Sequence, residues 1–137
     1  MRKALHCTAC GAQLSRPLRI LSLKDPAVGR PEHEPEKPLS DPGTAYKSYE
    51  PIERSYSDQP ARLEFAPQYW INPEDLDKSV RWTRKRKRMD GCCGVAGANG
   101  PNKLCACGAE IGTHRTDCWT SRVFIPEPAA TYWNEES

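Results

Sequence analysis

Seven of the 137 residues are cysteines, and they stand mostly in close pairs. Three pairs are followed by glycine: Cys-Thr-Ala-Cys-Gly at residues 7–11, the first knuckle, Cys-Ala-Cys-Gly at residues 105–108, the second knuckle, and the adjacent pair Cys-Cys-Gly at residues 92–94. A tight turn of this kind brings two thiolates within reach of one metal ion, and glycine permits the positive φ that such a turn requires. The spacing therefore predicts metal binding, most strongly at the first knuckle.

Counting the donors predicts one or two zinc ions. Seven cysteines and one histidine four residues before the last cysteine give eight ligands, which fill two tetrahedral shells. The predicted ligands are Cys7, Cys10, Cys92, Cys93, Cys105, Cys107, His114 and Cys118.

Two divisions of these ligands are open. In one, the first knuckle shares an ion with the second knuckle, and the other four ligands hold a second ion. In the other, the first knuckle joins Cys92 and Cys93. Loop length does not decide between them, because doubling a loop costs only about 0.6 kcal/mol. His6 lies beside the first knuckle as a reserve ligand, and His33 is expected in a solvated linker.

Composition explains why such a chain needs a metal. The mean hydropathy is −0.77, only two Phe and two Met are present, and 13 Pro and nine Gly interrupt regular elements. Small chains with thin cores need a disulfide, a metal or a partner. No apolar segment resembling an export signal or a membrane span is evident, so we expect a cytoplasmic protein with metal-binding cysteines and no membrane partner.

The elements that position the cysteines are expected to be short. Asn72, Pro73 and the acids after them form a helix-start signal, and Gly91 is a stop signal, which together predict a helix over about residues 73–89. Its second half is a run of cations. Short strands are predicted at 4–6 and 18–21, as a hairpin around the first knuckle, and at 103–104 and 121–125.

The predicted fold is a small metal-stapled α+β fold of zinc-ribbon-like β-hairpins plus one basic helix, with a long irregular Pro-rich linker. The predicted segments are a zinc-knuckle hairpin (1–24), an acidic Pro-rich linker (25–62), a helical segment with a basic C-terminal half (63–90), a Cys-rich zinc module (91–126) and a tail (127–137). The linker is expected to be largely unstructured, because it carries no hydrophobic periodicity.

The two knuckles resemble those of zinc-ribbon proteins. The stretch 91–120, with its Gly-Cys-Cys-Gly, Gly-Pro-Asn and Asp-Cys-Trp-Thr motifs, is similar to small cysteine-rich zinc-binding proteins of bacteria. The resemblance implies bound zinc and does not imply a particular biological role. The 94 residues between the knuckles depart from a compact ribbon.

Three functions fit these features. The first is a zinc-stabilised protein-interaction module, an adaptor or assembly factor, whose acidic arm becomes ordered on a protein partner. The alternative is a module that binds DNA or RNA, with Trp70, Trp82 and Trp119 as stacking surfaces. A lesser alternative is a small zinc-dependent or redox enzyme, and no catalytic residues are predicted. The predicted nucleic-acid-binding residues are Arg81, Arg84, Lys85, Arg86, Lys87 and Arg88.

Overall fold

The computed structural model describes residues 2–52, 63–91, 94–97, 100–117 and 120–136. Within these ranges the chain forms strands and two short 3₁₀ turns, and no α-helix, so the predicted α+β class is wrong. None of the described helical turns is long and apolar enough to cross a membrane. The elements are β1 (Arg2–Cys7), β2 (Arg19–Ser22), β3 (Thr44–Ser48), β4 (Gln68–Ile71), η1 (Pro73–Asp75), β5 (Arg81–Trp82), η2 (Arg86–Met89), β6 (Lys103–Leu104), β7 (Glu110–Arg115), β8 (Val123–Pro126) and β9 (Thr131–Glu136).

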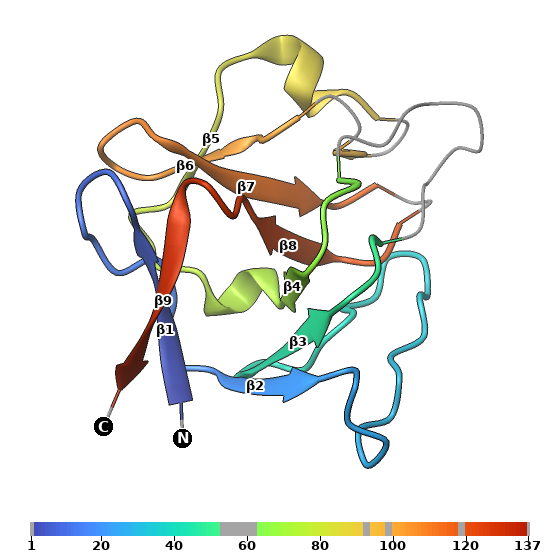
Figure 1. The fold of residues 1–137 in the computed structure, drawn as a ribbon. Coiled ribbons are helices and arrows are strands. Elements are labelled where there is room, and N and C mark those ends of the chain that lie inside the picture. Colours follow the sequence, from blue (N-terminus) through green and yellow to red (C-terminus); the bar gives the residue numbers. More distant parts are fainter. Residues whose placement is uncertain (1, 53–62, 92–93, 98–99, 118–119, 137) are drawn as a thin grey trace.

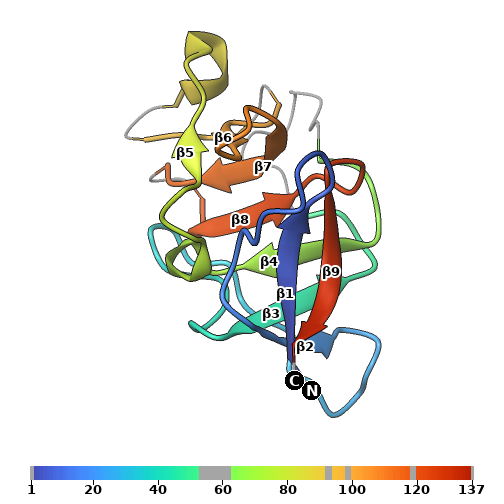
Figure 2. The same ribbon diagram turned by 90° about the vertical axis from the view of Figure 1, so that its left-hand side faces the viewer.

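Seven strands form one sheet in the order β2-β3-β4-β8-β7-β6-β5 (Figure 1). Strands β2 and β3 are parallel, and the other neighbours are antiparallel. The first and last strands form a separate antiparallel pair that runs from Arg2 opposite Glu136 to Cys7 opposite Thr131. This pair lies against the larger sheet with both chain ends together (Figure 2).

The strands at the centre of the larger sheet are buried on both faces. In β8, Phe124 joins one apolar cluster, the first core, while Val123 and Ile125 join another, the second core. Strand β4 alternates in the same way, with Ile71 in the first core and Trp70 in the second. The period-two alternation of strands therefore supplies both layers of core. The first core comprises Leu5, Cys7, Leu14, Leu18, Ala45, Ile71, Cys105, Ile111 and Phe124.

The helix predicted over residues 73–89 is absent. Asn72 does cap a turn by accepting a hydrogen bond from the N–H of Glu74, but η1 ends at Asp75 and Leu76 is extended. Beyond it, the N–H of Asp77 donates to Leu14 instead of to the preceding turn. A helix would also set like charges four residues apart along 81–88, which is unfavourable. Pairing with distant segments therefore replaces the helix.

The predicted Pro-rich linker is folded in its described part, which corrects the fold class in a second respect. Strand β3 lies inside it, between β2 and β4. Farther upstream, the N–H of Leu39 donates to Arg122, whose own N–H donates to Lys37. The side chain of Leu39 is 5% exposed and packs in the second core. Sparse apolar residues in this stretch are thus enough to dock it.

The N-terminal segment differs from the predicted hairpin in its pairing. Strands form close to both predicted positions, as β1 and β2, but β1 pairs with β9. The chain after the first knuckle does return antiparallel to β1, but through isolated bridges, from His6 to Gln13 and from Lys3 to Leu18, and not through a strand. The strand at 103–104 is confirmed as β6, and the strand predicted at 121–125 is confirmed as β8 with slightly shifted bounds.

Candidate metal centre

Four cysteine sulfur atoms gather where the turn after β1 meets the turn between β6 and β7. The Sγ atoms of Cys7, Cys10, Cys105 and Cys107 all lie within 4.8 Å of one another, close enough to hold a metal ion. Cys7 Sγ is 3.7 Å from Cys107 Sγ, and Cys10 Sγ is 3.6 Å from Cys105 Sγ. A disulfide would require a sulfur–sulfur distance of about 2.05 Å. Of the two predicted divisions, the structure has the one that joins the two knuckles.

The two knuckles have the same backbone design. In the first, the N–H of Cys7 donates to Ala12 and the N–H of Gly11 donates back to Cys7. In the second, the N–H of Cys105 donates to Ala109 and the N–H of Gly108 donates back to Cys105. The glycines have φ angles of 76° and 94°, in the left-handed region that favours glycine. Each turn therefore presents its two thiols to the other turn.

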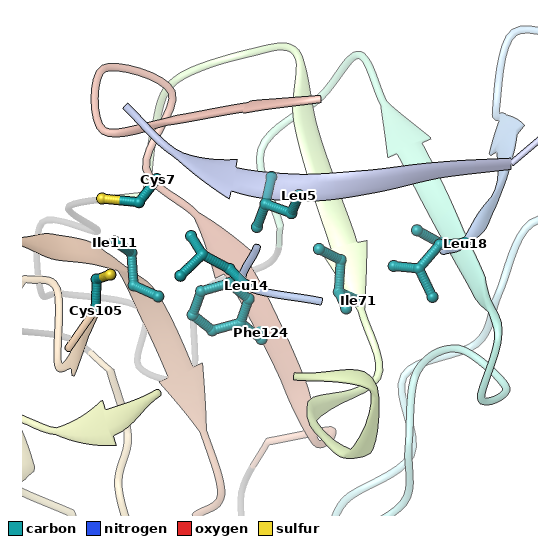
Figure 3. Close-up of a cluster of buried hydrophobic side chains, with 9 residues drawn as sticks. Leu5, Cys7, Leu14, Leu18, Ile71, Cys105, Ile111 and Phe124 are labelled. Carbon is teal, nitrogen blue, oxygen red and sulfur yellow. The ribbon is translucent and has the colours of Figure 1, made fainter. Parts of the chain in front are cut away.

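Strand pairing positions the knuckles. The first knuckle begins at the last residue of β1, which is held by β9, and the second is the turn between β6 and β7. Cys7 and Cys105 are fully buried and belong to the first core, whereas Cys10 and Cys107 are exposed. Figure 3 shows both buried cysteines at one end of this core, with Leu18 at the other. The cluster thus joins the strand pair to the larger sheet.

The buried and exposed thiols differ in acidity. Burial raises the pKa of Cys105 to about 12, while a hydrogen bond from the backbone N–H of Ala109 lowers the pKa of Cys107 to about 7. A buried thiolate is costly unless a positive charge compensates it. A metal ion supplies that charge, and thiolate is the form of cysteine that binds metal.

The other predicted ligands are not part of this cluster. Cys92, Cys93 and Cys118 lie outside the described residues, so the second metal site stays a prediction. His114 lies on β7, where its ring stacks on Trp82 with a centroid distance of 4.7 Å. His6 stacks on Tyr132, and neither histidine belongs to the four-sulfur group.

The predicted nucleic-acid-binding residues form the surface around β5 and η2. Arg81, Arg84, Lys85, Arg86 and Lys87 are exposed, and Arg88 is half-buried. Of the three tryptophans proposed to stack on bases, Trp70 is only 2% exposed and donates its ring N–H to Gln68, so it serves the core. Trp82 is half-buried, and Trp119 lies outside the described residues.

Three residues that shape this surface were not predicted to do so. The side chain of fully buried Asn102 hydrogen-bonds both the N–H and the carbonyl of His114, and its own carbonyl accepts from Thr83. Lys103 places its ammonium 3.8 Å from the centre of the Trp82 ring. Glu110 pairs with Lys85 at 2.9 Å and also with Arg88. In the sequence, the one sign of these roles was the negative charge of Glu110, which is opposite to that of the cationic run at 81–88.

Comparison of the chain with protein-family models, curated proteins and solved structures gave no match. Function is therefore inferred from the site itself.

Proposed function

We propose that this protein is a zinc-stabilised binding module in which a structural ion is held by Cys7, Cys10, Cys105 and Cys107. The observation that carries the proposal is the spacing of the four sulfur atoms. Zn–S bonds of about 2.3 Å in a tetrahedron place the sulfur atoms about 3.8 Å apart. Two of the distances between the knuckles, 3.6 and 3.7 Å, agree with that value. Four thiolates are also a donor set typical of structural zinc.

A structural role follows from the number of ligands. A catalytic zinc keeps one coordination position for water or substrate, and four cysteines leave none. The same shell argues against redox chemistry at the first knuckle, because its thiolates are engaged in binding the ion. The role of the ion is then to hold the fold, and the function of the protein is to present a surface to a partner.

The position of the cluster gives zinc a large effect on stability. The ion would tie together two turns whose nearest ligands, Cys10 and Cys105, have 94 residues between them in the sequence. In the chain-entropy treatment of cross-links, closing a loop of about 100 residues is worth about 4–5 kcal/mol. Folded domains have a net stability of only about 5–15 kcal/mol. Losing this link should therefore release β1 and β9 from the larger sheet.

The test is metal analysis of the full chain combined with removal of the ion. Native mass spectrometry with elemental analysis should give zinc in the purified protein. Replacement by Co²⁺ should give the absorption bands of a tetrahedral thiolate site. Chelation should lower the thermal unfolding temperature, and added zinc should restore it, since metal binding and folding are coupled in such sites.

A matched pair of substitutions locates the site. Cys107→Ser removes one exposed ligand and should lose the ion from this cluster. Ala106→Ser changes the exposed neighbour in the same turn and should retain it. Native mass spectrometry and the Co²⁺ spectrum report both results. A chelated protein with unaltered stability, or a Cys107→Ser protein with an unchanged thiolate spectrum, would refute the proposal.

A further inference from the structure

A basic cleft lies beside the second knuckle and has no part in metal binding. Its volume is about 540 Å³. Residues from β5 and the segment after it form one side, and the hairpin of β6 and β7 contributes the other. Glu110 is the only acid among its described lining residues. The lining residues that bear on ligand binding are Arg81, Trp82, Arg84, Lys85, Gly108 and Glu110.

The cations along this cleft do not stabilise the end of an α-helix. Cations near the C-terminus of an α-helix can be explained by the helix dipole. Here residues 81–82 are a strand and η2 has only four residues, so this explanation does not apply. Six cations in eight residues repel one another, and this repulsion needs an opposing charge.

Glu110 supplies only part of that charge. Its carboxylate pairs with Lys85 and Arg88, and Arg88 also donates to the carbonyl of Pro101. No ion pair to an acid is formed by Arg81, Arg84 or Arg86 in the described part of the chain. All three are exposed. Arg81 and Arg84 line the cleft, and Arg86 follows them at the start of η2, so the cleft and the adjoining turn together offer three uncompensated guanidinium groups. Guanidinium binds phosphate well because of its fork of N–H donors.

A fixed aromatic ring lines the same cleft. Trp82 is held by the stacked ring of His114 and by the ammonium of Lys103, which lies 3.8 Å from the ring centre. Trp82 as a residue is half-buried and lines the cleft, so the part of it that His114 and Lys103 do not cover is accessible there. An aromatic surface among cations is the combination by which proteins bind unpaired bases and their phosphates together.

We propose that this cleft binds single-stranded nucleic acid, with Arg81, Arg84 and Arg86 contacting phosphates and Trp82 contacting a base or sugar. A concave site with an aromatic wall suits an unpaired strand, because the bases of a duplex are stacked on each other. A protein partner was expected to order a flexible acidic arm, but β3 of that arm is already a strand of the sheet, and Leu39 of the same arm packs in the second core. Binding at the cleft goes beyond the proposed zinc role, since none of these contacts involves a metal ligand.

The test uses the full zinc-loaded chain and fluorescence anisotropy. The probes are labelled oligothymidylate and oligouridylate of about 12 nucleotides, within the range that such sites cover. Binding should be measurable at low salt. A plot of log affinity against log salt should have a slope of about −2, as expected for three phosphates on a single strand. A duplex of equal length and thymidine monophosphate serve as competitors and should bind more weakly.

Three variants assign the binding to the cleft. Arg84→Glu with Arg86→Glu should weaken binding by at least about tenfold and make the salt slope shallower by about 1.4. Glu110→Gln should strengthen binding severalfold and steepen the slope, because it frees Lys85 and Arg88. The control is Arg2→Glu with Arg19→Glu, which makes the same change of net charge. These residues begin β1 and β2, and in both views the N-terminus and β2 lie at the bottom, whereas the yellow 3₁₀ turn η2 lies at the top (Figures 1 and 2).

The basic N-terminus therefore does not extend this surface, and the control should bind as the parent does. Zinc content and thermal unfolding of each variant show whether the fold is intact. The inference is overturned if no oligonucleotide binds at low salt, if the control loses as much affinity as the cleft variant, or if the duplex or the mononucleotide binds as tightly. Loss of zinc without unfolding would refute the zinc role alone and would leave this binding assay valid.

Discussion

Substituting Gly112 with alanine tests the packing of the sheet that carries the second knuckle. Gly112 lies in β7 between Lys103 of β6 and Pro126 of β8. A Cβ atom at this position would lie 2.5 Å from the carbonyl oxygen of Ile125 and 2.6 Å from the ring of Phe124. Its φ is not positive, so the backbone accepts alanine and only the lack of space opposes the substitution.

The expected cost follows from those two contacts. Adding a methyl group to a filled core costs about 1–3 kcal/mol. The value should lie in the upper part of that range, because one of the atoms that must move belongs to the backbone of the neighbouring strand. Gly112→Ala should therefore lower the free energy of unfolding by about 2–3 kcal/mol in urea denaturation, with an unchanged m-value.

Two further variants make this prediction specific. Gly29→Ala is the matched control, because Gly29 is exposed and a Cβ atom there would have no neighbour within 4 Å. This substitution should change the free energy of unfolding by less than about 0.5 kcal/mol, or raise it slightly by restricting the unfolded chain. Phe124→Leu should be less harmful in the Gly112→Ala background than in the parent, since it removes the ring atoms that clash. A Gly112→Ala protein as stable as the parent, or fully additive effects in the double variant, would refute this account of the packing.

Two other predictions concern buried polar groups. Gln68→Ala should lower the free energy of unfolding by about 2–4 kcal/mol in urea denaturation, because it leaves the N–H donors of Ile52 and Trp70 without their buried acceptor. The control Gln13→Ala changes an exposed glutamine and should have little effect. Equal effects of the two substitutions would contradict the burial argument. Burial, with Lys103 and Arg122 nearby, lowers the pKa of His114 to about 3, so its contribution to stability is complete above pH 6.5 and is lost as the pH falls toward 3. Relative to His114→Phe, the parent should therefore lose up to about 1.4 kcal/mol per pH unit below pH 6.5, and a pH-independent difference in unfolding free energy would refute this.

The two cysteine turns of the candidate metal centre could be predicted from the sequence because their signal is local. A pair of cysteines followed by glycine specifies a turn, and this turn can be recognised without knowing which other cysteines lie next to it in the fold. The partner of the first knuckle could not be predicted, because loop entropy hardly depends on length over such distances. In the structure, the pairing of β1 with β9 and of β6 with β7 makes the choice.

The predicted helix shows why the fold class could not be obtained in the same way. Its start signal at Asn72 is real and gives a hydrogen-bonded cap. The course of the chain after this cap is decided by contacts with residues far away in the sequence. The carboxylate of Asp75 accepts the N–H of Gly43 at 2.8 Å and pairs with Arg16 at 3.0 Å, and these contacts fix the chain where a helix would have to continue. Local propensity is a weak prior against such tertiary contacts.

The metal centre and the basic cleft are joined by one short hairpin. Gly108 of the cleft directly follows Cys107 of the four-sulfur cluster, and Glu110 begins β7 two residues later. Zinc would therefore fix the position of the one acid that holds Lys85 and Arg88 beside the cleft. If the two proposals are both correct, removing zinc should change the affinity for an oligonucleotide even though no ligand of the ion touches the strand. The Glu110→Gln protein, which lacks that acid, should show a smaller change in affinity on chelation than the parent.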